Sequence, residues 1–250
     1  MWPFPKIVAH RGGGKLAPEN TIAGFRTGLD HGFRAVEFDV MLSRDGVPVV
    51  MHDPFLGRTV SGTGNVFDYD AAELTRMDAG SWFSSEFRGE PVPLYTQVVA
   101  FCKANGIWMN VELKPAPGYE AETGRVVAEL THALFGSEIA QDDLSLLPLF
   151  SSFSAAALAA ARDSAPDLPR GLLVQQAPAD WALLAHGLGA MAIHHDHQTL
   201  TPALAAAIKA AGFGLFCYTV NDPERARELL AWGVDGFCTD RIDLIGPDFA

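Results

Sequence analysis

The feature that most constrains this chain is a repeated alternation of short apolar runs with segments of helical spacing. Leucine and alanine recur three and four residues apart between the runs, most clearly at residues 155–165 and 223–233. Eight runs have the length of strands: residues 6–10, 35–40, 107–113, 146–150, 170–174, 190–194, 213–219 and 234–239. Eight strand and helix units within 250 residues predict a (β/α)₈ TIM barrel rather than an open doubly wound sheet.

One interval does not fit the alternation. Residues 53–92 are too long for a plain strand-to-helix loop, and they are rich in Gly, Asp and Ser, with turn signals at SGTGN and DAGSW. Just before them, residues 43–53 indicate a tight turn and a short extended segment that returns to the barrel rim at His52. We therefore expect a single barrel domain over residues 1–250, with a small insertion at about residues 53–92 after the second strand.

The composition limits the cellular setting and the partners. A hydrophobic content of 48% is enough for a sizeable core, and 18 Lys and Arg against 30 Asp and Glu give a net charge of −12. This charge argues against a general affinity for nucleic acid or for an anionic membrane surface. No signal segment or transmembrane run is apparent, and the three cysteines form no CxxC pair, so a cytoplasmic protein without stable membrane association is expected. The oligomeric state is not determined by these features.

Carboxylates gather on two predicted strands. Glu37 and Asp39 are two residues apart on one strand, and Glu112 and Lys114 are two apart on another, so each pair shares a side of its strand. Active sites of TIM barrels lie at the carboxyl ends of the strands. If the shared sides face the barrel interior, three carboxylates meet in a poorly solvated place and need positive charge.

Two sources of that positive charge are possible. One divalent cation, Mg²⁺ or Ca²⁺ with Mn²⁺ also possible, suits the oxygen ligands of Glu37, Asp39 and Glu112 better than zinc does. The alternative is an internal salt-bridge network that uses Arg11 and Lys114. Because two strands each place charge on one side, we favour the metal.

Two histidines and two cations lie at the same predicted rim. His10 ends the first strand and His52 ends the extended segment, so the two imidazoles are candidates for a general acid and a general base. Arg11 and Lys114 are candidates for binding phosphate oxygens. Glu19 is a weaker candidate for contact with the site. This set of side chains suits displacement at phosphorus.

Other polar and aromatic residues are weaker candidates. HHDH at residues 194–197 has a metal-like spacing, but we favour no second metal there and expect His194 to line the pocket at most. Tyr218 ends the seventh strand and is expected to face substrate. Asn20 or Thr21 is expected to cap the first helix.

An ordered set of motifs points to a known family. AHRGG, APENT, VEFDV, SRDG, MHD, a Glu-Leu-Lys-Pro run, SSF, YTVND and GVDGFCTDRID follow one another over residues 7–246. Together they resemble the glycerophosphodiester phosphodiesterase family, most closely its bacterial cytoplasmic type. The resemblance implies a TIM barrel with a small inserted region and a metal-dependent hydrolysis of glycerophosphodiesters. Glycerophosphocholine and glycerophosphoethanolamine are the implied substrates, and sn-glycerol 3-phosphate and an alcohol are the implied products.

The resemblance also implies roles for individual residues. It assigns acid–base catalysis to His10 and His52, phosphate binding to Arg11 and Lys114, and metal binding to the three carboxylates named above. All these positions are occupied as the family pattern requires, whereas Tyr218 stands where many relatives carry Trp. A lysophospholipid or sphingolipid phosphodiesterase of related fold, or a non-catalytic glycerophosphodiester-binding protein, are the alternatives. The nucleophile is either water or the neighbouring glycerol hydroxyl.

Overall fold

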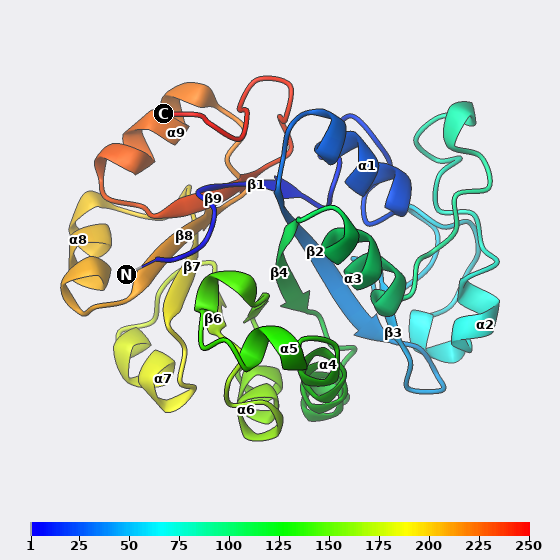
Figure 1. Cartoon of the computed structure of the whole chain (residues 1–250), viewed down its shortest axis with the longest axis horizontal. Coiled ribbons are helices and arrows are strands. Elements are labelled where there is room, and N and C mark those ends of the chain that lie inside the picture. The colour runs from blue at the N-terminus through cyan, green and yellow to red at the C-terminus, as the bar shows by residue number, and fades with distance from the viewer. Residues whose placement is uncertain (1) are drawn as a thin grey trace.

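Eight parallel strands close into a barrel surrounded by helices (Figure 1). The structure is a computed structural model that describes residues 2–250. The barrel strands are β1 (Ile7–His10), β2 (Ala35–Leu42), β4 (Trp108–Leu113), β5 (Leu149–Ser152), β6 (Arg170–Val174), β7 (Ala192–Asp196), β8 (Gly214–Tyr218) and β9 (Gly236–Thr239). Each pairs in parallel with its neighbours, and the pairing of β1 with both β2 and β9 closes the ring. The predicted TIM barrel is confirmed.

The helices connect successive strands. They are α1 (Ile22–Asp30), α2 (Ala71–Leu74), α3 (Tyr95–Ala104), α4 (Glu120–Leu134), α5 (Gly136–Ile139), α6 (Ala155–Ser164), α7 (Trp181–Gly187), α8 (Pro202–Ala210) and α9 (Pro223–Ala231). The two segments with the clearest helical spacing form α6 and α9. Asp222 caps α9, with its side chain accepting a hydrogen bond from the Glu224 backbone N–H.

Two strands lie further along the chain than the apolar runs predicted. β5 begins at Leu149 because residues 144–146 form a 3₁₀ turn, capped by the Asp143 side chain, and Pro148 follows it. β7 begins at Ala192 and extends to Asp196. The apolar residues that precede both strands instead belong to the connections from the helices before them.

A short hairpin leads from the barrel to the inserted segment. β3 (Pro48–Val50) pairs antiparallel with the end of β2 and so stays outside the ring. The segment that follows, residues 53–92, has an apolar cluster of its own that includes Leu56, Val66 and Leu74 and packs against Met41 of β2. In Figure 1 this segment lies at one side of the barrel, next to β3. A small insertion after the second strand is thus present.

An aromatic layer closes the amino-terminal end of the barrel. Trp2 stacks on Phe216 at 5.7 Å between ring centroids, and Phe4 stacks on Trp108 at 4.7 Å. Trp2 and Phe4 also meet edge to face at 5.0 Å. Because such pairs bury large apolar surfaces, this end of the barrel is held by packing.

Other expectations from the sequence concern the thiols and the membrane. Cys102, Cys217 and Cys238 are buried free thiols. Over residues 2–250, no helix combines the length and the apolar character that a membrane crossing needs.

Candidate active site

The candidate residues gather at the carboxyl ends of the strands. A cavity of about 160 Å³ opens there. Seven of the eight candidate site residues line it: His10, Arg11, Glu37, His52, Glu112, Lys114 and Tyr218. The eighth, Asp39, lies 3.1 Å from the Lys114 ammonium, measured from Oδ1 to Nζ. The fold therefore brings the whole predicted set together.

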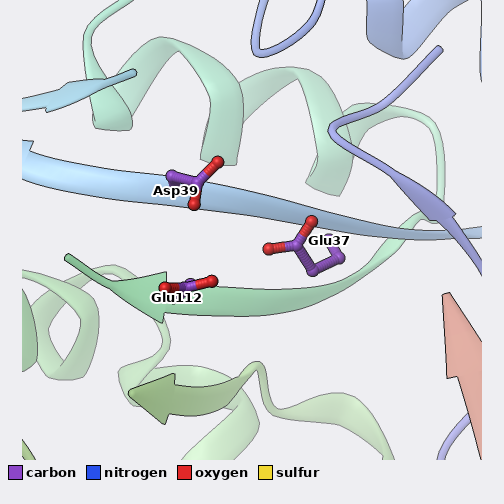
Figure 2. A group of neighbouring side chains, drawn as sticks. All are labelled: Glu37, Asp39 and Glu112. Atoms are coloured by element: carbon purple, nitrogen blue, oxygen red, sulfur yellow. The ribbon is translucent and has the colours of Figure 1, made fainter. Parts of the chain in front are cut away.

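Three carboxylates form the centre of this group. Glu37 and Asp39 come from β2, and Glu112 comes from β4 in register with Asp39. One oxygen from each lies within 4.8 Å of the others, and Figure 2 shows the three groups turned toward a common space. The Glu37 and Asp39 side chains are buried and that of Glu112 is 12% exposed. Three oxygen donors at this spacing fit a hard divalent cation.

The pKa values of these carboxyls indicate that the positive charge around them is insufficient. Burial raises the pKa of Glu37 to about 7 and that of Glu112 to about 8, and repulsion from Asp39 adds to both shifts. Burial also acts on Asp39, but the charges of Lys114 and Arg11 hold its pKa well below the usual range. Without a further cation, two of the three carboxyls therefore retain protons near neutral pH.

The salt-bridge network left open by the sequence is present but incomplete. Lys114 Nζ lies 3.1 Å from Asp39 and 3.5 Å from Glu112, and Arg11 Nε lies 3.6 Å from Asp39. Among the three clustered carboxylates, Asp39 is thus the main partner of both cations. Arg11 Nε has no hydrogen-bond partner among residues 2–250. Since Glu37 and Glu112 keep raised pKa values beside this network, its cations compensate their charge only in part.

His10 forms one wall of the cavity. It ends β1, and its Nδ1 lies 2.6 Å from Asp240 Oδ1, while its Nε2 lies 3.6 Å from Glu37 Oε2. Burial lowers the pKa of His10, but the hydrogen bond with Asp240 and the charge of Glu37 outweigh this effect and raise it. Asn221 donates to the other Asp240 oxygen at 2.9 Å. The imidazole is therefore fixed in orientation by a carboxylate that is itself held.

His52 also lines the cavity, and its imidazole has a similar support. It follows β3, and its Nδ1 lies 2.6 Å from Asp53 Oδ1. Arg58 donates to the other Asp53 oxygen and also to both oxygens of Glu19. Burial lowers the pKa of His52, and the charges of Arg11 and Lys114 lower it further. Each histidine thus has one ring nitrogen on a carboxylate.

Arg11 reaches the site from the turn after β1. Its guanidinium donates to Glu19 Oε1 at 2.8 Å, so Glu19, the weaker candidate, holds Arg11 in place. The turn itself depends on Gly14, which has a φ of +53° and lies so close to the Asp240 backbone that a Cβ atom would collide with it. The glycine run therefore allows the turn to pack closely against Asp240, which is the hydrogen-bond partner of His10.

Comparison with known proteins decides the family. The family model described as the glycerophosphoryl diester phosphodiesterase family matches residues 10–244. The chain belongs to this family. A glycerophosphodiester phosphodiesterase of Caldanaerobacter subterraneus subsp. tengcongensis is 32% identical over 238 residues, covering 94% of this chain and 93% of the relative. A Bacillus subtilis glycerophosphodiester phosphodiesterase is 30% identical over 251 residues, covering 95% and 84%.

A solved structure supports the same assignment. An Oleispira antarctica phosphodiesterase in complex with its product sn-glycerol-3-phosphate superposes with a TM-score of 0.86 at 35% identity, covering 94% of this chain and 93% of that one. The resemblance found in the motifs is confirmed, and the chain is assigned to the phosphodiester hydrolases.

Tyr218 lies at the rim of this family member's cavity. Its hydroxyl donates to the Val174 carbonyl at 2.9 Å, and its ring meets the half-exposed ring of Phe153 edge to face at 5.8 Å. The cavity therefore has an aromatic side at the end of β8, as expected from the sequence. The Tyr218 hydroxyl is occupied by the Val174 carbonyl.

Three supporting residues were missed by the analysis of the sequence. Asp53 and Asp240 orient the histidines, and Asn20 donates to Asp39 Oδ2 at 2.8 Å. Asp240 directly follows the last strand and Asp53 directly follows His52, so their positions at strand ends were the available signal. Asn20 was taken as a possible cap, but Thr21 caps α1 by accepting a hydrogen bond from the Gly24 backbone N–H.

Proposed function

We propose that this protein hydrolyses glycerophosphodiesters such as glycerophosphocholine and glycerophosphoethanolamine to sn-glycerol 3-phosphate and an alcohol. The supporting observation is the meeting of three buried carboxylates with two carboxylate-held histidines and two cations in one cavity. The product bound to the Oleispira relative supports the same substrate class.

The proposal includes one divalent cation, Mg²⁺ or Ca²⁺, with Mn²⁺ as a further possibility. Glu37, Asp39 and Glu112 would hold it, since their oxygens lie close together and two of their pKa values show that positive charge is lacking. When bound, such a cation supplies Lewis-acid polarisation of a phosphoryl oxygen.

The chain's own cations bind the phosphate. Arg11 offers a guanidinium fork fixed by Glu19, and Lys114 offers a point charge beside Asp39. Together they orient the phosphodiester and stabilise the negative charge that develops on its oxygens during displacement.

The two histidines move the protons. One takes a proton from the nucleophile, and the other protonates the oxygen of the leaving alcohol. Asp240 and Asp53 hold His10 and His52 through Nδ1, so Nε2 is the nitrogen that acts on substrate. If the nucleophile is the neighbouring glycerol hydroxyl, a cyclic glycerol phosphate forms transiently and rapid quenching would detect it. If the nucleophile is water, no such species forms.

The substrate class is tested by a panel of phosphodiesters. Metal-supplemented protein at catalytic concentration should release sn-glycerol 3-phosphate from glycerophosphocholine and glycerophosphoethanolamine. Cleavage of lysophospholipids or sphingolipids alone would instead support the related-fold phosphodiesterase. Stoichiometric binding of glycerophosphodiesters without turnover would support a binding protein. The proposal treats residues 1–250 as one domain, and the cytoplasmic location expected from the sequence stays a prediction.

A further inference from the structure

A group of uncharged polar side chains lines the same cavity as the carboxylates. Asn110 on β4 is two residues before Glu112 and so shares its inward side, and Ser151 on β5 is in register with Glu112. His194 on β7 lines the same cavity. The exposed fractions of Asn110, Ser151 and His194 are 2%, 1% and 1%, so these three residues form a buried polar group beside the carboxylates, hereafter called the floor of the cavity.

Each of these three side chains has an unsatisfied polar atom. Asn110 Oδ1, Ser151 Oγ and His194 Nε2 have no hydrogen-bond partner among the residues that the structure describes. A buried polar group without a partner costs about 1–3 kcal/mol, and native proteins keep few of them. Three around one cavity therefore mark a place where a polar group that enters the cavity would complete their hydrogen bonds.

A glycine lets two of them approach each other. Gly171 on β6 lies between Ser151 on β5 and Ala192 on β7 in the register. A Cβ atom on Gly171 would lie 2.5 Å from His194 Nε2, so the imidazole occupies the space where a side chain would be. Because Gly171 is the register partner of Ser151, the imidazole lies over the strand next to Ser151.

The chemistry of the floor suits hydroxyl groups. Burial lowers the pKa of His194 to about 3, so its ring is neutral and offers one donor and one acceptor. Ser151 and Asn110 likewise donate and accept without carrying charge. The three side chains thus offer hydrogen bonds and no charge of their own, which suits an alcohol better than a phosphate or a cationic head group.

A groove that adjoins the catalytic cavity has room for a leaving group. Phe153 at the rim is 52% exposed and adjoins a groove of about 360 Å³ lined also by Pro115, Pro117 and Glu120. The groove shares Glu112 and Lys114 with the catalytic cavity. The head group can therefore face outward while the other half of the substrate faces the floor.

We propose that Asn110, Ser151 and His194 form a subsite for the terminal hydroxyl of the glycerol moiety. This inference rests on the proposed function and adds the orientation of the substrate, with glycerol inward and the head group toward the groove. It predicts that selectivity lies in the glycerol hydroxyl rather than in the head group. A site built to hydrogen-bond a hydroxyl discriminates strongly against an analogue that lacks it.

The test compares glycerophosphoethanolamine with the analogue whose glycerol is replaced by propane-1,2-diol. This analogue keeps the secondary hydroxyl next to the phosphate and lacks only the terminal one. In the unmodified protein, we expect kcat/KM for the analogue to be lower by roughly 10- to 100-fold. In Ser151→Ala, the ratio between the two substrates should fall toward one, and His194→Phe provides a second variant with the same expectation.

A matched control separates the subsite from general loss of structure. Thr123 on α4 also carries a buried hydroxyl without a hydrogen-bond partner among residues 2–250, and it lies outside the barrel. Thr123→Val should therefore leave the substrate ratio at its original value. Since both substrates are measured on the same protein, a change in folding or metal content cancels from each ratio.

The outcomes distinguish the two proposals. A ratio near one in the unmodified protein, or a ratio that neither floor variant changes, would overturn the subsite while leaving the proposed function intact. If neither substrate is turned over, the proposed function fails, and calorimetry with metal-loaded protein decides the subsite. Tighter binding of sn-glycerol 3-phosphate than of propane-1,2-diol phosphate would then support the subsite, and equal binding would overturn it.

Discussion

The two ends of the barrel are formed by the same eight strands, yet different forces organise them. At the amino-terminal end, Trp2, Phe4, Trp108 and Phe216 pack ring against ring. At the carboxyl end, buried carboxylates repel one another, and the available cations neutralise them only in part. The amino-terminal end therefore contributes stability. The carboxyl end is less stable than packing alone would make it, because its charged groups are arranged in a way that suits binding of metal and phosphate.

The largest expected effect is on turnover and comes from the carboxyl end. His52→Ala removes one member of the proposed acid–base pair and should lower kcat by about 10²- to 10⁴-fold. Metal binding and the melting temperature should change little, because His52 is half-buried and is not one of the proposed ligands. Steady-state kinetics, calorimetric metal titration and thermal melting check this prediction. Near-normal turnover would remove His52 from the mechanism.

The next effect falls on stability and comes from the amino-terminal end. Phe4→Ala removes a ring that is 5% exposed and stacks on Trp108, which should lower the free energy of unfolding by about 3 kcal/mol. Turnover at low temperature should stay within about twofold, a margin of about 0.4 kcal/mol. Urea denaturation and a kinetic assay on the same sample check both statements. A large loss of turnover without a loss of stability would break the division between the two ends.

A third prediction gives the carboxyl end two opposite responses. Glu112→Gln removes one proposed metal ligand and should weaken binding of the divalent cation by roughly 10- to 100-fold. The metal-free variant should be at least as stable as the metal-free parent, because glutamine is neutral in both the folded and the unfolded chain, whereas the raised pKa of Glu112 makes folding cost free energy at neutral pH. Calorimetry and thermal melting in EDTA measure the two responses. Unchanged metal affinity would favour the salt-bridge network over the metal site.

The smallest effect is on the pH dependence of stability and comes from His194 in the floor of the cavity. The pKa of buried His194 is lowered from 6.5 to about 3, so below pH 6.5 the unfolded chain takes up a proton that the folded chain does not. Glu37 and Glu112 have raised pKa values that act in the opposite direction, but they are common to the parent and to His194→Phe. Relative to His194→Phe, the parent should therefore lose stability as the pH falls below 6.5, at a rate that approaches about 1.4 kcal/mol per pH unit. Urea denaturation of both proteins at pH 6.5 and 5.5 measures this difference, and an identical change with pH in the two proteins would contradict a neutral buried His194.

The strands and the central residues could be predicted because they depend on local patterns. Apolar runs of strand length marked the barrel, and polar residues on buried strands marked Glu37, Asp39 and Glu112. The start of β5 could not be located, because apolar Leu146 and Leu147 satisfy the strand pattern while Asp143 caps a 3₁₀ turn there. Local sequence did not distinguish these two structures.

The supporting residues were harder to predict because their partners are distant in the sequence. Asp240 lies 230 residues from His10, and its role appears only when β1 and β9 are paired to close the ring. Asn20 had a plausible local role as a helix cap, and only the fold shows that it donates to Asp39. The floor of Asn110, Ser151 and His194 likewise combines three strands whose polar residues seem unrelated along the chain.

We propose above that the carboxyl end of the barrel hydrolyses glycerophosphodiesters with a divalent cation. The most direct measurement is release of sn-glycerol 3-phosphate from glycerophosphoethanolamine by EDTA-stripped protein, before and after addition of Mg²⁺, Mn²⁺ or Ca²⁺. We expect no release from the stripped protein and recovery of release with at least one of these ions. Full activity of the stripped protein, or no release with any ion, would contradict this proposal.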